Sequence, residues 1–242
     1  GHTAHLYFVF FFGGGCHQKI GLTVEEHSRL GTLEYFYGEL DSGEVRHSLT
    51  ASESPTAPEA KSRWPLSPAQ AFFTRVPLSA QNPGTDLFVA RAESLPEDWK
   101  LKEELVWCAG TETWKKLASR GIWVHGCADG LGESLPPLGP LAGREVRFTK
   151  LTHDRSNNEG VFPLLATYRL ENADFTLPPA ESYFWMSETT FSRALSLNPS
   201  IREARHAAGP GYTAQAIERI LGRPIEVYIN YRHWKNGDPL GN

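Results

Sequence analysis

The 242-residue sequence is poor in cysteine, in long apolar runs and in excess basic charge, and each shortage excludes a class of protein. Its three cysteines, Cys16, Cys108 and Cys127, are too few and too far apart for a disulfide framework or a paired-cysteine metal site. The longest aromatic and aliphatic run, Leu6 to Phe12, is far shorter than the roughly 20 residues that span a bilayer. The 24 Lys and Arg residues against 28 Asp and Glu give a net charge of -4, which provides no global positive field for nucleic acid. We therefore expect a cytoplasmic protein with neither a membrane nor a nucleic-acid partner.

Familiar catalytic motifs are also missing. Neither glycine-rich segment has the spacing of a phosphate loop or of a dinucleotide-binding turn, so nucleotide binding has no motif support. No Ser-His-Asp set, carboxylate pair or cluster of metal-ligating residues stands out, and we expect no metal.

The first part of the chain predicts a small sheet followed by a linker. Three short apolar segments are predicted strands: 20–24, 32–40 and 44–50. An Asp-Ser-Gly turn joins the last two. Four prolines among small polar residues then deny the backbone its hydrogen-bond donors over 52–68. We therefore expect a module over 1–51 and a linker over 52–68.

Beyond the linker, strands alternate with helices. The apolar run 105–109 precedes a helix that Thr111 would cap, and the same order recurs at 183–197 and at 204–221. Such alternation indicates parallel sheets covered on both faces. The Pro- and Gly-rich segment 136–143 suggests a crossover between two lobes.

The predicted fold class is therefore α/β, with two doubly wound lobes of mainly parallel sheet and a small N-terminal three-stranded α+β module. We place the first lobe at 69–138 and the second at 139–242. The first lobe is short, which predicts that it is truncated.

The carboxy-terminal segments carry a resemblance. The sequences Tyr-Phe-Trp-Met-Ser at 183–187, His-Ala-Ala-Gly-Pro-Gly-Tyr-Thr-Ala at 206–214 and Leu-Gly-Arg at 221–223 occur in that order. Together they resemble uroporphyrinogen-III synthase, whose strands end in Ser/Thr or Gly-Pro turns before helices. The segments 88–92 and 108–113 resemble the same repeat in the first lobe, and the likeness extends over about 72–234.

The resemblance implies an enzyme of tetrapyrrole and haem biosynthesis, a cyclising hydro-lyase. Such an enzyme closes the linear tetrapyrrole hydroxymethylbilane to uroporphyrinogen III, with loss of water and inversion of the last pyrrole ring. The substrate's own nitrogens expel the hydroxyl, so the protein's main tasks are to fold the chain and exclude water. No cofactor is implied for this reaction.

The resemblance also implies roles for particular residues. Leu-Ala-Thr-Tyr-Arg at 165–169 matches a family strand whose tyrosine is the catalytic candidate, so Tyr168 would hydrogen-bond the departing hydroxyl; the alternative is a packed strand tyrosine. Arg169 would contact substrate, or be a solvated surface arginine. The other substrate-binding candidates lie at helix starts, where the alternative role is capping: Thr111, Thr113, Ser187, Thr189, Thr190, Gly209, Pro210, Gly211 and Thr213.

A second resemblance lies upstream. The sequence Phe-Gly-Gly-Gly-Cys-His-Gln-Lys at 12–19 and the strands after it resemble the third domain of hydroxymethylbilane synthase (porphobilinogen deaminase). That family attaches dipyrromethane to the loop cysteine, so Cys16 would hold this cofactor in a full-length parent, with the remaining deaminase domains as partners; the alternative is an ordinary exposed thiol.

The two resemblances together suggest a fragment of a bifunctional fusion. The alternatives to a cyclising enzyme are a deaminase fragment and a non-catalytic module that binds tetrapyrroles or assists assembly.

Overall fold

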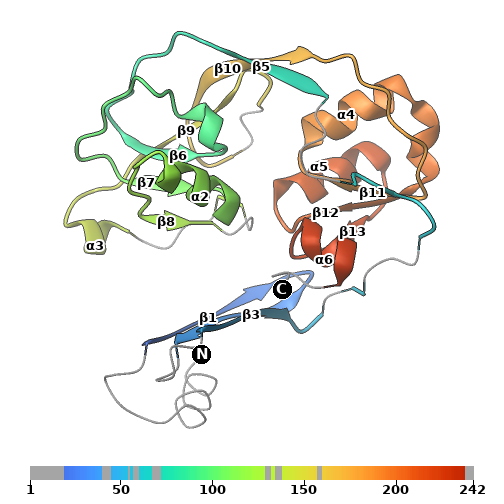
Figure 1. Ribbon diagram of the computed structural model, residues 1–242, viewed down its shortest axis with the longest axis horizontal. Coiled ribbons are helices and arrows are strands. Elements are labelled where there is room, and N and C mark those ends of the chain that lie inside the picture. The colour runs from blue at the N-terminus through green and yellow to red at the C-terminus, as the bar shows by residue number, and fades with distance from the viewer. Residues whose placement is uncertain are drawn as a thin grey trace.

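The computed structural model describes residues 19–39, 45–53, 55–56, 60–66, 72–128, 132–133, 138–156 and 160–237. Their strands form three sheets, of three, six and four strands. Figure 1 shows the six-stranded and four-stranded sheets in two lobes, with β5 and β10 on the side where the chain passes between them, and the three-stranded sheet beside the lobes. No helix in the described part of the chain is long and apolar enough to cross a membrane.

The three-stranded sheet is antiparallel, as the sequence predicts. Its strands are β1 (Lys19–His27), β2 (Gly31–Glu39) and β3 (Val45–Ala51), in that spatial order. Gly31 has φ +66°, a left-handed conformation that favours glycine where β1 turns into β2. Leu30 and Leu33, both fully buried, belong to the hydrophobic core of the four-stranded lobe. The tip of the hairpin is therefore anchored on that lobe.

The six-stranded sheet has the order β5-β10-β9-β6-β7-β8. The inner strands pair in parallel, and only the edge strand β5 runs antiparallel to its neighbour β10. Leu87 and Val89 of β6 pack in one core cluster with Leu117 of helix α2. Phe88 lies between them on the other face of the strand and packs against Phe162, with ring centroids 5.2 Å apart. The elements of this lobe are β5 (Phe73–Pro77), β6 (Asp86–Val89), η1 (Ala92–Ser94), β7 (Val106–Cys108), α2 (Thr111–Ser119), β8 (Gly126–Cys127), α3 (Gly139–Ala142), β9 (Phe148–His153) and β10 (Leu164–Asn172).

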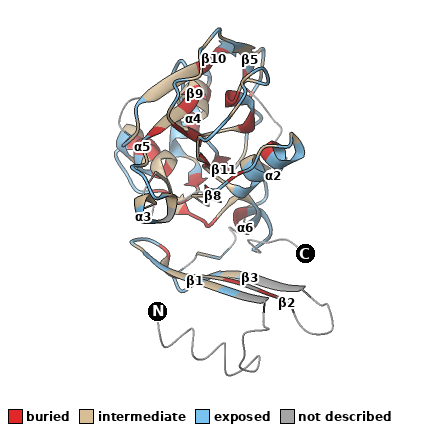
Figure 2. Cartoon of the chain, turned by 90° about the vertical axis from the view of Figure 1, so that its left-hand side faces the viewer, coloured by how far each residue is buried: buried red, intermediate tan, exposed pale blue. Residues whose placement is uncertain are grey.

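The four-stranded sheet is all parallel, in the order β13-β12-β11-β4. Alternate residues of β11 face opposite layers: Tyr183 and Trp185 join the core under α4 and α5, and Phe184 packs with Trp234 of α6. Figure 2 shows how burial concentrates in the strands while the outer face of α2 is exposed. The elements are β4 (Arg63–Trp64), β11 (Ser182–Trp185), α4 (Glu188–Leu197), η2 (Pro199–Glu203), β12 (Arg205–Ala208), α5 (Tyr212–Leu221), β13 (Glu226–Val227) and α6 (Tyr231–Asn236).

The fold class is confirmed: the chain is α/β, with mainly parallel sheets and a small antiparallel sheet. The lobes divide the chain differently from the predicted 69–138 and 139–242. Strands β9 and β10 pair in the first sheet, because their apolar residues complete its core rather than starting a new one. The first lobe therefore has six strands and is not short of sheet.

The predicted linker 52–68 also contains structure. Within it, β4 pairs in parallel with β11 and so adds an edge strand to the second sheet. The chain enters the second lobe at β4, builds the first lobe from β5 to β10, and then returns at β11. The two crossings lie between 64 and 73 and between 172 and 182, and not at 136–143.

Candidate functional site

The parallel strands β6, β7 and β9 all end on the same side of the six-stranded sheet. We call this side, where the strands end, the carboxyl edge. Ligands of open α/β sheets bind outside the carboxyl ends of their strands, because the helices and loops that follow open a crevice there. After β6 the chain turns into η1, and after β7 it turns into α2. The side chains gathered at this edge are therefore the first place to look for chemistry.

Tyr168 lies at this edge. It pairs with His153, the last residue of β9, and it is only 3% exposed. The rings of Tyr168 and His153 have centroids 5.8 Å apart. Burial raises the pKa of the Tyr168 phenol, while the positive charges of Arg91 and Arg75 oppose that rise. At neutral pH the phenol is protonated and can donate a hydrogen bond.

Two arginines approach Tyr168 from different strands. Arg75 in β5 pairs with Leu170, and in an antiparallel register this makes it the diagonal neighbour of Tyr168 on the same face of the sheet. Its guanidinium lies close enough to lower the pKa of the Tyr168 phenol. Arg91 follows β6 and starts η1, and η1 is held on β10 because Thr167 Oγ1 donates to the Ser94 carbonyl at 2.6 Å.

Arg91 is half-buried and close to a second cation. Burial lowers the pKa of its guanidinium, and the neighbouring charge of Arg75 lowers it further. The carboxylate of Glu93 acts in the opposite direction, but that carboxylate lies 3.0 Å from Lys116 Nζ and is engaged there. Arg91 nevertheless remains protonated at neutral pH.

His153 adds a neutral ring to the same group. Burial lowers its pKa to about 4; Asp154 opposes the shift, and the charges of Arg91, Lys150 and Arg75 add to it. Its Nδ1 atom is buried and has no hydrogen-bond partner within the part of the chain that the structure describes. A buried polar atom without a partner is uncommon in a folded protein and points to a group that awaits one. We refer to Arg75, Arg91, His153 and Tyr168 as the Tyr168 cluster.

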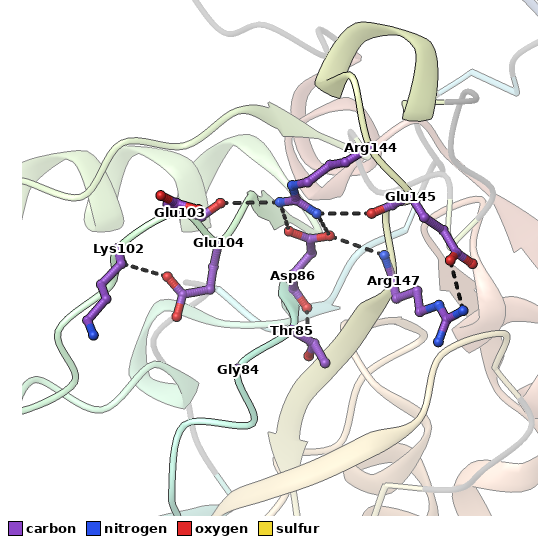
Figure 3. A pocket seen from close by; sticks show the side chains of 9 residues that line it. All are labelled: Gly84, Thr85, Asp86, Lys102, Glu103, Glu104, Arg144, Glu145 and Arg147. Carbon is purple, nitrogen blue, oxygen red and sulfur yellow. Dashed lines mark hydrogen bonds and ion pairs between the residues drawn. The ribbon is translucent and has the colours of Figure 1, made fainter.

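A pocket of about 620 Å³ lies at the opposite end of the six-stranded sheet, where β6, β7 and β9 begin. We call this end the amino edge. Figure 3 shows Asp86, the first residue of β6, at the centre of the pocket with Arg144 beside it. The Asp86 carboxylate accepts two hydrogen bonds from Arg144, at 2.8 and 2.5 Å, and one from each backbone amide of Leu105 and Arg147, at 2.9 and 3.1 Å.

These contacts fasten the start of β6 to the segments entering β7 and β9. Burial opposes ionisation of Asp86, but the bonds from Arg144, Leu105 and Arg147 outweigh it and hold the pKa of the carboxyl below its usual value. A carboxylate with four donors is fully satisfied. We therefore assign the Asp86 group to the architecture of the sheet.

The structure places the predicted site residues of the first lobe in different positions. Thr111 and Thr113 begin α2 at the carboxyl edge, as expected, but the N-cap of α2 is Gly110 rather than Thr111. Arg169 lies on the face of β10 opposite to Tyr168, is exposed, and forms a salt bridge with Glu171 at 2.6 Å. The cluster therefore does not include Arg169. Cys16 lies outside the described residues.

In the second lobe, Ser187 caps α4. Its Oγ accepts from the Thr190 amide at 3.2 Å and lies 2.7 Å from Thr190 Oγ1, so both hydroxyls are used in the cap. Thr189 is half-buried one residue into the same turn. The capping alternative thus holds for Ser187 and Thr190, and substrate contact by the three residues stays a prediction.

Gly209, Pro210 and Gly211 form the turn between β12 and α5, with Gly211 as N-cap and Thr213 half-buried on the first turn. The hairpin reaches this turn: His27 Nε2 lies 3.2 Å from the Pro210 carbonyl oxygen. Sequence reasoning placed the turn correctly at a strand end, and it missed the hairpin contact because the two segments are far apart in the chain.

His206 is a structural residue, as its position in an apolar strand suggests. Its Nδ1 accepts from Trp185 Nε1 at 2.9 Å, so its Nε2 carries the proton and donates to the Ile201 carbonyl at 2.8 Å. Burial lowers the pKa of the ring to about 4.

Sequence reasoning missed Arg75 altogether. Nothing in the sequence around β5 shows that this strand joins the sheet antiparallel to β10, and only that register brings Arg75 beside Tyr168. Among the described residues, no group of three or more His, Cys, Asp or Glu side chains is placed to hold a metal ion.

Comparisons with known proteins find no match by sequence and only weak similarity to solved structures. No protein-family profile matches the chain, and no curated protein matches it by sequence. A crystal structure of a mutant uroporphyrinogen III synthase from the extremely thermophilic bacterium Thermus thermophilus is 15% identical, with a TM-score of 0.36 over 60% of this chain and 72% of that one. A second structure, of Thermus thermophilus uroporphyrinogen III synthase, is also 15% identical, with a TM-score of 0.33 over 64% and 80%.

Neither structure is a hydroxymethylbilane synthase, so the resemblance of the first 51 residues to that enzyme has no support from the comparisons. The residues of this chain, rather than these two similarities, are the basis for assigning a function.

Proposed function

We propose that the chain is a cyclising hydro-lyase of tetrapyrrole biosynthesis that converts hydroxymethylbilane to uroporphyrinogen III. The single observation that carries the proposal is the placement of Tyr168, which sequence resemblance singles out and which lies buried and protonated at the carboxyl edge of a parallel sheet. A second support is the first sheet, because the lobe that the sequence suggested was truncated contains six strands.

In this reaction the substrate supplies most of the driving force. A pyrrole nitrogen pushes out the terminal hydroxyl, which leaves as water after it gains a proton, and the azafulvenium that remains is attacked by the last pyrrole. Ring inversion follows before the macrocycle closes. The protein has to hold a flexible chain in a near-closed conformation and keep water away from the cation.

Tyr168 suits the role of hydrogen-bond donor to the departing hydroxyl. Its environment keeps the phenol neutral, and a neutral donor assists departure without needing a strong acid. The strand-to-helix turns at Thr111, at Ser187 and at Gly209–Pro210–Gly211 would hold the substrate's side-chain carboxylates through backbone amides. The reaction as proposed requires no cofactor, and dipyrromethane on Cys16 stays a prediction for a longer parent.

A coupled assay tests the proposal. Hydroxymethylbilane is generated by a separate deaminase, the purified chain is added, and the oxidised porphyrin products are separated into type I and type III isomers. We expect the type III isomer to predominate. The symmetric type I isomer forms spontaneously, so its exclusive formation at the rate seen without the chain would reject the proposed activity.

Two variants make the assay specific. Tyr168→Phe removes the phenol at the carboxyl edge, and Tyr231→Phe removes one from α6, where its hydroxyl donates to the Pro65 carbonyl at 2.7 Å. Both changes delete one tyrosine hydroxyl. Only the first is expected to slow formation of the type III isomer.

A further inference from the structure

Arg75 and Arg91 lie near the same phenol, and neither forms a salt bridge with a described carboxylate. Arg144, Arg169 and Arg205 each form a salt bridge with a carboxylate, at 2.5, 2.6 and 2.5 Å. Among the described residues, no carboxylate lies within salt-bridge distance of Arg75 or Arg91. Two guanidinium groups therefore converge on Tyr168 with their charge unneutralised.

This arrangement is unfavourable in the absence of a ligand. Arg91 is half-buried, so it has lost part of its hydration, and the like charge of Arg75 repels it. Glu93 is the acid whose charge opposes the lowering of the Arg91 pKa, yet its carboxylate is engaged by Lys116 Nζ at 3.0 Å. A charge arrangement that opposes folding is expected at a binding site, where a ligand supplies the missing counter-charge.

The neighbouring groups point to the same kind of ligand. The Tyr168 hydroxyl is a neutral donor, and His153 carries a buried ring nitrogen, Nδ1, that has no partner. Arg91 is half-buried and precedes η1, whereas Arg75 is exposed on the edge strand β5. Both arginines therefore retain some exposure to solvent, as required for binding a carboxylate on the rim of a larger molecule.

We infer that Arg75 and Arg91 form a subsite that binds one carboxylate of a polycarboxylate ligand and so places the ligand beside the Tyr168 hydroxyl. Guanidinium groups bind carboxylates through paired, charge-assisted hydrogen bonds, which fix orientation as well as position. This inference rests on the proposed function for the identity of the ligand, but it can be tested by binding alone.

The test measures binding of uroporphyrin I, a stable porphyrin with eight carboxylates, by its fluorescence at pH 7.5. Three single variants are compared with the wild type: Arg75→Gln, Arg91→Gln and Arg147→Gln. Arg147 is the matched control, because it is an exposed arginine of the same sheet at the opposite edge, paired with Glu145 at 2.8 Å. Each variant removes one positive charge, so a general charge effect would be the same in all three.

We expect Arg91→Gln and Arg75→Gln each to weaken binding by about 10- to 100-fold, since each removes a hydrogen-bonded charge pair with the ligand. Arg147→Gln is expected to change the dissociation constant by less than about twofold. Arg91→Lys should recover part of the affinity, because it keeps the charge and loses the paired geometry. Equal affinity in the wild type and in both cluster variants, each shown to be folded by circular dichroism, would overturn the subsite.

The outcomes separate this inference from the proposed function. If the chain forms no type III isomer but loses uroporphyrin affinity in the cluster variants, the subsite stands and the proposed reaction fails. If the type III isomer forms at wild-type rates in both cluster variants and affinity is unchanged, the reaction stands and the subsite fails.

Discussion

The two edges of the six-stranded sheet hold similar residues in opposite states. At the amino edge, the buried carboxylate of Asp86 has four donors, two of them from Arg144. At the carboxyl edge, no described carboxylate lies within salt-bridge distance of Arg75 or Arg91, and the buried Nδ1 of His153 has no hydrogen-bond partner among the described residues. Charged side chains that satisfy one another stabilise a fold, whereas charged side chains left unmatched provide the energy to bind something else.

A search based on cavity volume alone would have placed the binding site at the amino edge. The cavity of about 620 Å³ lies around Asp86, and its lining combines acidic and basic side chains that pair among themselves (Figure 3). Volume alone does not identify a binding site when the polar groups lining it are already paired. The comparison therefore predicts that changes at the amino edge affect stability and that changes at the carboxyl edge affect ligand and rate.

The largest expected effect is on stability, at the amino edge. Asp86→Ala should lower the free energy of unfolding by about 3 kcal/mol, because it removes a buried carboxylate and leaves the amides of Leu105 and Arg147 without an acceptor. Urea denaturation followed by tryptophan fluorescence measures the change. Uroporphyrin affinity of the folded variant should be unchanged, and a large loss of affinity would break the division between the two edges.

A pH effect of similar size is expected from His206, whose nitrogens are both bonded, in contrast to His153. Its pKa is about 4 in the folded chain and about 6.5 when unfolded, so the unfolded chain binds more protons between these values. Stability is therefore complete above pH 6.5 and falls as the pH is lowered toward 4, by about 3 kcal/mol for this group.

Urea denaturation at pH 7 and pH 4.5 measures that loss. His206→Gln lacks the titrating ring, so its stability should depend less on pH across this window than that of the wild type. An identical dependence in the two proteins would show that His206 is not the titrating group.

A smaller effect is expected on the activation free energy of the reaction when the carboxyl edge is altered. Tyr168→Phe should lower turnover by about 10- to 100-fold, equivalent to about 1.4 to 2.7 kcal/mol, because one hydrogen bond to the leaving group is lost. Substrate folding survives, so some activity should remain. Wild-type turnover in the folded variant would remove Tyr168 from the mechanism.

The smallest effect is expected for Arg147→Gln, which breaks an exposed salt bridge to Glu145. Solvent and salt screen exposed pairs, so both stability and turnover should stay close to those of the wild type. A tenfold loss of turnover in this variant would extend the functional surface to the amino edge.

The order of strands and helices could be predicted from local sequence, and the arrangement of the sheets could not. The segments around Tyr183–Trp185 and Tyr212–Leu221 fold as their periodicity indicates. Assignment of β9 and β10 to the first sheet depends on pairing with β6, which a local pattern does not encode. The pairing of β4 with β11 was hidden for the same reason, because a two-residue strand among prolines resembles a linker.

The site could be predicted only in part. Tyr168 and Thr111 stand out because a strand or a turn surrounds them in the sequence, and both lie at the carboxyl edge. Arg169 was selected for its place beside Tyr168, yet neighbouring strand residues point to opposite faces. Arg75 was missed because its proximity to Tyr168 arises from an antiparallel pairing between residues almost a hundred positions apart.

Hydrogen–deuterium exchange with and without bound uroporphyrin I tests the central claim most directly, because it locates the ligand without altering the chain. The account predicts slower exchange at the carboxyl edge, in peptides containing Ala92–Ser94, the start of α2 and the end of β9. Exchange at the amino edge, in peptides containing Asp86 and 102–105, should be unchanged. Protection confined to the peptides around Asp86, with none at the carboxyl edge, would contradict the account.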